Sequence, residues 1–148
     1  MDKPINRPTG MPLPNRDPMQ MGFWEGAAQG RLDIQRCDDC GAHRYPCSMG
    51  CTTCGSMRWG WDTLPGSGSV VSYVWIPDPG RPPGFPSHFY NVAVIELDGV
   101  EKGPVRIISN VLDAWNLDDL RSGMRVELSC VKLTEDMGLP CFTRAGEA

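Results

Sequence analysis

Two Cys-x-x-Cys pairs in the first half of the chain restrict its fold more than any other feature. The pairs are Cys37/Cys40 and Cys51/Cys54, and ten residues separate them. A glycine follows each pair directly and permits the tight turn of a metal-binding knuckle. Two knuckles supply four thiolates at tetrahedral geometry, which suits a closed structural Zn²⁺ site. The spacing therefore predicts structural zinc, with iron in the same four-sulfur arrangement as the alternative.

The remaining cysteines bear on the compartment and on packing. Five of the seven cysteines fall within 18 residues, and such clustering in a reducing compartment favours metal binding over disulfides. Cys47 lies between the two pairs as a spare thiol or a competing ligand, whereas Cys130 and Cys141 suit small core or interface positions. The N-terminus lacks the apolar segment of a secretory signal, and no apolar run approaches the ~18 residues of a membrane span. We therefore expect a cytoplasmic protein without a membrane segment.

For residues 1–32 the sequence predicts little regular structure beyond one short helix. Glycine (17) and proline (14) are frequent in this chain of 148 residues, which favours loops and short strands over long helices. Residues 1–21 contain five prolines and little hydrophobic periodicity, so we expect a flexible, extended arm. Residues 22–32 carry aromatic and alanine side chains at helical spacing, and Gly30 is placed to end a short helix.

The rest of the chain has strand character. Five runs of β-branched, aromatic or alternating apolar residues predict short strands, with one helical turn at 116–123 after the third strand. This pattern matches the five-stranded Greek-key barrel known as the OB-fold. We therefore predict a mainly β protein with an arm at 1–21, an N-terminal helix and zinc ribbon at 22–63, and an OB-fold domain at 64–148. The predicted strands lie at 70–76, 91–97, 104–111, 124–133 and 139–144.

A proline-rich loop at 77–90 is the most informative feature outside the cysteines. It places five prolines and two glycines around Arg81, Phe85 and His88. A long, stiff loop between two strands is more often functional than incidental, and these residues suit an apolar surface with one cation. The loop is therefore predicted to line a ligand channel or to dock a partner. Because the usual nucleophile and phosphate-binding motifs are missing from the sequence, the chain does not look like an enzyme on its own.

Taken in order, these motifs resemble a family of bacterial and archaeal zinc-ribbon/OB-fold proteins known as domain of unknown function 35. The resemblance runs from about Phe23 to Arg144, and its blocks are specific in combination. It implies an N-terminal helix, a rubredoxin-like zinc ribbon and a C-terminal OB barrel. The blocks are FWEGAAQGRLDIQRCDDCGAHRYP, CTTCGS, SGSVVSYVWI, PPGFP, YNVAVIELDG, DDLRSGMRV and LPCFTRA.

The resemblance also implies a function. Members of this family are typically not catalysts but pair with thiolase-superfamily enzymes, which make or break carbon–carbon bonds of acyl-CoA thioesters. The small protein stabilises such a thiolase, acyltransferase or side-chain aldolase and helps to shape its acyl-CoA entrance. A 2+2 heterotetramer follows by analogy, since thiolase-fold enzymes are usually dimers. The family's metal ligands fall on Cys37, Cys40, Cys51 and Cys54, and its proline-rich loop falls on Pro82 to Pro86.

Contact with acyl-CoA would require particular side chains of this chain. In the proline-rich loop, Arg81, Phe85 and His88 are the predicted contacts with the CoA thioester. Five tryptophans suit a large protein interface, in which aromatic and arginine anchors dominate. The phosphates of CoA need basic partners, for which the candidates are Arg36, Arg44, Arg58 and Arg81.

A nucleic-acid-binding module is the alternative function. Zinc ribbons and OB barrels both serve that role in other proteins. The charge balance disfavours it here, because 14 Lys and Arg stand against 18 Asp and Glu, for a formal net charge of −4. Nucleic-acid-binding domains are usually strongly basic. We therefore expect an acyl-CoA enzyme as partner, and nucleic acid only if that expectation fails.

Overall fold

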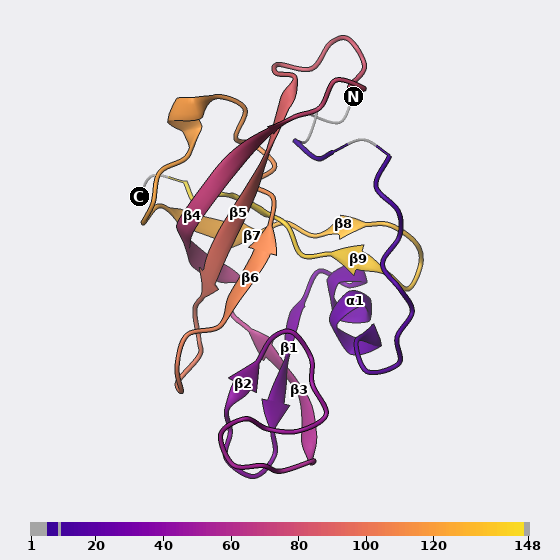
Figure 1. The fold of residues 1–148 in the computed structure, drawn as a ribbon, viewed down its shortest axis with the longest axis vertical. Helices are drawn as coiled ribbons and strands as arrows, with labels where there is room; N and C mark the ends of the chain where they lie inside the picture. The colour runs from indigo at the N-terminus through magenta and orange to yellow at the C-terminus, as the bar shows by residue number, and fades with distance from the viewer. Residues whose placement is uncertain (1–5, 9, 147–148) are drawn as a thin grey trace.

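The computed structural model describes residues 6–8 and 10–146. Within them the protein is mainly β, with a short α-helix, a three-stranded ribbon and a five-stranded barrel (Figure 1). This architecture confirms the predicted fold class. No helix in these ranges is long and apolar enough to cross a bilayer.

Helix α1 (Met21–Ala28) precedes the ribbon and packs on it. Of the apolar face predicted for it (Phe23, Trp24, Ala27 and Ala28), Phe23 and Ala27 are buried, together with Gly26, while Trp24 and Ala28 are half-buried. Beyond the helix, Gly30 adopts a positive φ of 79°, a conformation that glycine reaches without steric penalty. The backbone N–H of Arg31 then donates to the carbonyl of Gly26, so the chain turns sharply into the first strand.

The ribbon is an antiparallel sheet in the order β2-β1-β3. Strand β1 (Leu32–Cys37) pairs along its whole length with β3 (Trp59–Leu64), and β2 (His43–Arg44) lies on its other side. This register places Cys37 opposite Trp59, at the end of the sheet where the knuckles begin.

The barrel is a sheet in the order β10-β7-β4-β5-β6. It closes where Val111, just after β6, forms a parallel bridge with Phe142 of β10. The Leu112 N–H donates to the carbonyl of Phe142 at 2.7 Å, which secures this closure. The strands are β4 (Ser67–Pro77), β5 (Phe89–Leu97), β6 (Arg106–Ser109), β7 (Arg125–Leu128) and β10 (Phe142–Arg144), with the 3₁₀ turn η1 (Leu117–Asp119) after β6.

Two of the predicted strands are each divided in the structure. The run at 124–133 forms β7 and a short β8 (Val131–Lys132), and the run at 139–144 is divided between β9 (Gly138–Leu139) and β10. Pro140 separates β9 from β10 and offers no backbone N–H to a ladder. The β8–β9 hairpin leaves the barrel and packs against α1 (Figure 1).

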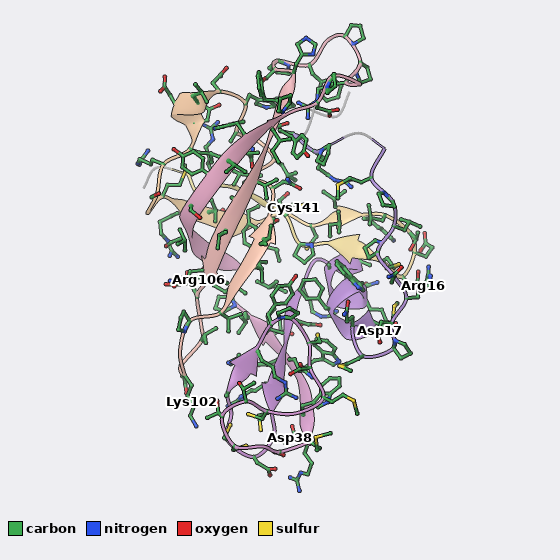
Figure 2. The ribbon with its side chains drawn as sticks, viewed as in Figure 1. Arg16, Asp17, Asp38, Lys102, Arg106 and Cys141 are labelled. Atoms are coloured by element: carbon green, nitrogen blue, oxygen red, sulfur yellow. The ribbon has the colours of Figure 1, made fainter. Side chains whose placement is uncertain are left out.

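The ribbon and the barrel share one hydrophobic core. Phe23, Leu32 and Ile34 belong to the same buried cluster as the barrel residues Ile95 and Phe142. The β5–β6 hairpin also reaches the ribbon, because the ammonium of Lys102 near its tip donates to the carbonyl of Cys40 (Figure 2). The two parts are therefore held together by core packing and by a polar contact, and the domain limits at 22–63 and 64–148 stay a prediction.

The described part of the N-terminal stretch lies along the chain's own barrel and hairpin. Asn6 is fully buried, donating its backbone N–H to Leu112 and its side-chain amide to the carbonyl of Ala114. Arg16 pairs with Asp136 in the β8–β9 turn (Figure 2). The predicted flexibility of residues 1–21 stays a prediction, and 1–5 and 9 lie outside the described residues.

Candidate metal centre and the proline-rich loop

The four cysteines of the two pairs form a compact sulfur cluster. Their Sγ atoms all lie within 4.8 Å of one another, with 3.6 Å between Cys37 and Cys54 and 3.6 Å between Cys40 and Cys51. A tetrahedral site with Zn–S bonds of about 2.3 Å requires sulfur–sulfur separations of about 3.8 Å. The arrangement therefore fits a four-thiolate metal ion with no open coordination position.

Both knuckles are built by the same backbone turn. The N–H of Gly41 donates to the carbonyl of Cys37, and the N–H of Gly55 donates to that of Cys51. The two glycines adopt φ values of 77° and 78°, which explains why glycine follows each pair.

Backbone amides of the knuckles also stabilise the thiolate form of two of the four cysteines, Cys37 and Cys51. The amides of Cys54 and Thr53 lower the pKa of Cys51 to about 6. The amide of Cys40 lowers the pKa of Cys37 in the same way. Hydrogen bonds to a charged form favour that form, and metal ligation requires it.

The other three cysteines lie outside this cluster. Burial raises the pKa of Cys47, which is half-buried next to Arg44. Burial likewise raises the pKa of Cys130 to about 11 and that of Cys141. All three are therefore neutral thiols at pH 7.

The buried side chain of Arg81 connects the two ends of the proline-rich loop. The side chain is fully buried, with Nε 3.3 Å from the carboxylate of Asp78. One terminal nitrogen donates to the carbonyls of Ser87 and Phe89, and the other donates to the carbonyl of Arg7, each at 3.0 Å. The guanidinium therefore ties together both ends of the loop and the N-terminal stretch.

The faces of the same guanidinium lie against aromatic rings. Its central carbon is 5.3 Å from the ring centroid of Phe85 and 5.6 Å from that of Trp115. The structure thus brings Arg81 and Phe85 together. The side chain of His88 is exposed, and its backbone carbonyl accepts a hydrogen bond from the N–H of Asp78. Contact of these three residues with a CoA thioester stays a prediction.

The other arginines proposed for CoA phosphates fall into two settings. Arg44 is buried and donates to Gln35 and to the carbonyl of Ser48 within the ribbon. Arg36 and Arg58 are exposed beside the metal knuckles. These three side chains also stay predictions as phosphate ligands.

An apolar groove of about 270 Å³ opens beside the loop, at the end of the barrel. Its lining includes Leu117, one of the most exposed large apolar side chains of the described chain. The groove could not be predicted from the sequence, because its walls come from segments that are distant in the chain. Trp75, near the end of the first predicted strand, was the available signal. The lining residues are Trp75, Ser87, Phe89, Trp115, Asn116 and Leu117.

Comparison with known proteins agrees with this geometry. The rubredoxin-like zinc-ribbon domain of ChsH2 matches residues 24–59, and the C-terminal OB-fold domain of ChsH2 matches residues 61–131. A solved structure described as "Ltp2-ChsH2(DUF35) aldolase" is 33% identical, with a TM-score of 0.72. The match covers 90% of this chain and 98% of that one. The chain belongs to the ChsH2 zinc-ribbon/OB-fold family.

Two further relatives extend the comparison for this ChsH2-like chain. A "Probable enoyl-CoA hydratase alpha subunit" of Thermomonospora curvata is 35% identical over 136 residues, or 90% of this chain. The chain spans about two fifths of that relative, 39% of its length. A DUF35 protein of unknown function from Sulfolobus solfataricus has a TM-score of 0.50 at 17% identity, covering 75% of this chain and 77% of that one. At that identity the likeness concerns the fold alone.

Proposed function

We propose that this ChsH2-like chain is a non-catalytic accessory subunit of a thiolase-like enzyme that acts on acyl-CoA thioesters. The observation that carries the proposal is the match to the solved Ltp2-ChsH2 aldolase, which is 33% identical and of which this chain covers 98%. In the proposed complex the partner performs the chemistry. This chain stabilises the partner and shapes the acyl-CoA entrance.

The metal centre supports an accessory role. Four thiolates within 4.8 Å of one another would fill a tetrahedral coordination sphere, so the zinc would hold the ribbon together and would not bind substrate. The imidazole of His43, in strand β2 of the ribbon, is itself held by Asp62 at 2.7 Å. These groups are committed to structure.

The proline-rich loop is the part of the chain proposed to reach the acyl-CoA. Because the Arg81 guanidinium donates to the carboxylate of Asp78 and to three backbone carbonyls of this chain, we assign it a positioning role for the loop. Phe85 and His88 would then contact the thioester. The neighbouring aromatic groove, at about 270 Å³, suits an apolar acyl group, since ligand sites are mostly apolar with few polar groups.

The first experiment is affinity purification of the tagged chain from its native host, followed by mass spectrometry. A thiolase-fold protein in stoichiometric amount supports the proposal, and the mass of the complex in solution tests the 2+2 assembly. Recovery of nucleic acid without such a protein would replace the proposal by the nucleic-acid alternative. The cytoplasmic location is tested by fractionation of the same cells.

The loop is tested in the purified complex with Phe85→Ala and His88→Ala. Both should raise the KM for acyl-CoA while the subunit stays bound, because neither side chain carries the loop's internal hydrogen bonds. An unchanged KM in both variants would remove the loop from the acyl-CoA site. Glu101→Ala, in the exposed β5–β6 turn, is the matched control and should leave the KM unaltered.

A further inference from the structure

Strand β5 is apolar on both of its faces. Its inward residues Ala93, Ile95 and Leu97 are buried in the barrel core. The outward positions include Val92 and Val94, which a solvent-facing strand would fill with polar side chains. Strands that are apolar on both sides usually have both sides covered. The outer side of β5 is therefore a candidate for burial in an assembly.

The register extends this apolar surface over three strands. Val74 of β4 lies opposite Val92, and Ile108 of β6 lies opposite Val94. Val74 is 56% exposed and Ile108 is 69% exposed, values unusual for side chains of this type in a folded protein. We define the outer β4–β6 face by the residues Ser72, Val74, Ile76, Tyr90, Val92, Val94 and Ile108, among which Ser72, opposite Val94, is polar but uncharged.

The outer β4–β6 face carries no ionised side chain. At its end nearest the ribbon, Glu96 and Arg106 lie opposite one another and pair at 3.1 Å, so their charges offset each other (Figure 2). A nucleic acid, an anionic lipid or the phosphates of CoA would need basic groups, which this face does not offer. The complementary surface is therefore apolar and uncharged.

The N-terminal stretch borders the same face. A groove of about 470 Å³ runs between residues 8 and 10–12 on one side and the side chains of Tyr90, Val92 and Ile108 on the other. Met11 lines this groove and is itself 48% exposed. An aliphatic or aromatic side chain from another protein has room to enter here, in the manner of an interface anchor.

The size of the face indicates what kind of partner covers it. Three strands about 4.8 Å apart and five residues of β5 give a face of roughly 10 Å by 13 Å between backbone atoms. One side of a stable interface buries about 800 Å², several times this extent. If two copies of this barrel packed together through this face, their curved surfaces would bury little area outside the face. A larger protein that also contacts the N-terminal stretch can bury the rest.

We propose that the outer β4–β6 face, together with Met11, is the surface on which the thiolase-like partner docks. This inference rests on the proposed function and names the part of the chain that performs it. The partner presents an uncharged apolar patch there and inserts a side chain into the groove beside Met11. The contact is hydrophobic and only weakly sensitive to salt.

The test compares charged substitutions at equally exposed positions. The probe is the thiolase-like protein recovered with the wild-type chain, and its dissociation constant is measured by titration calorimetry. Ile108→Glu and Val74→Glu should each weaken binding by about 30-fold or more, the size of a loss of 2 kcal/mol at an interface hot spot. Met57→Glu, at a side chain 60% exposed in the ribbon, should change it by less than about threefold.

Further controls separate the outcomes. Zinc content and the unfolding midpoint show that each variant folds, and hydrogen exchange on the wild-type complex should protect residues 90–94 and 106–109. Binding that survives both substitutions, or protection confined to other segments, overturns the docking face while the accessory role stands. If the chain alone is a dimer and Ile108→Glu makes it monomeric, the face binds a second copy of the chain instead. If the wild-type chain recovers no thiolase-like protein, the proposed function fails, and the assignment of this partner fails with it.

Discussion

The guanidinium of Arg81 donates a hydrogen bond to the carbonyl oxygen of Arg7 across 3.0 Å, although 74 positions separate the two residues. The same side chain donates to the carbonyls of Ser87 and Phe89. One arginine therefore fixes the shape of the proline-rich loop and joins it to the N-terminal stretch. The planar fork of a guanidinium can serve these divergent acceptors, whereas an ammonium cannot.

Arg81→Met should loosen the loop and destabilise the protein. The substitution keeps an apolar stem but leaves the carboxylate of Asp78 without its guanidinium in a largely buried site. Removing one partner of a buried ion pair lowers the free energy of unfolding by about 3 kcal/mol or more. Urea unfolding measures this loss, and hydrogen exchange should accelerate at residues 78–89.

Arg121→Met is the matched control for this prediction, because Arg121 is exposed. Its effect on the free energy of unfolding should stay within about 0.5 kcal/mol. Arg81→Lys retains the charge without the fork, so we expect an intermediate loss. Unchanged exchange of residues 78–89 in Arg81→Met would contradict the positioning role of this arginine.

The metal site was predictable because its determinants are local. Two pairs of cysteines with a glycine after each specify two knuckles, and the structure brings the four sulfur atoms within 4.8 Å of one another. The end of α1 was predictable for the same reason, since Gly30 takes the positive φ that the turn requires. In both cases the signal lies within a few residues of the structure that it produces.

Long-range polar contacts could not be predicted in this way. Asn91 is fully buried at the start of β5 and bonds to the backbone of Val111 and Ala114, which follow β6. Asn6 donates to the same carbonyl of Ala114 from the other end of the chain. Arg81 likewise was identified from its loop but not from its acceptors. Such residues become neighbours only when the barrel closes, and no periodic pattern in the sequence indicates their contact.

Cys37→Ser should release the zinc and unfold the ribbon. With a ligand removed, the site loses binding energy that is also folding energy, about 10–16 kcal/mol for a complete structural zinc site. Zinc content is measured with a chromogenic chelator, and ribbon structure by circular dichroism. Cys47→Ser is the control, because Cys47 lies outside the sulfur cluster and should keep a full complement of zinc. Equal zinc loss in both variants would assign Cys47 to the ligand set.

Gly138→Ala should separate the β8–β9 hairpin from α1. A β-carbon at Gly138 would lie 2.5 Å from the backbone carbon of Ala27, and the helix backbone cannot move away without disturbing the core. Overpacking of this kind lowers the free energy of unfolding by about 1–3 kcal/mol. Gly146→Ala, where a β-carbon meets nothing within 4 Å, should leave it unchanged. Thermal unfolding of the two variants beside the wild type decides the prediction.

The Asp98–Arg125 pair should make stability depend on pH in the acid range. The guanidinium of Arg125 and the hydroxyl of Ser67 lower the pKa of Asp98 below its usual value. A carboxyl whose pKa is lowered in the folded state contributes stability above its unfolded pKa of about 3.9, and this contribution disappears as the pH falls through the folded pKa. Arg125→Gln should therefore lower the free energy of unfolding at pH 7 by up to about 1 kcal/mol, a modest loss because both side chains of the pair are partly exposed. Below pH 4 the free energies of unfolding of the variant and the wild type should converge. Urea titrations of the wild type and of Arg125→Gln at each pH measure this difference in stability. Loss of zinc in acid affects the two proteins alike, because both contain the same ribbon. A difference that stays constant down to pH 2 would show that Arg125 acts through packing and not through the charge of Asp98.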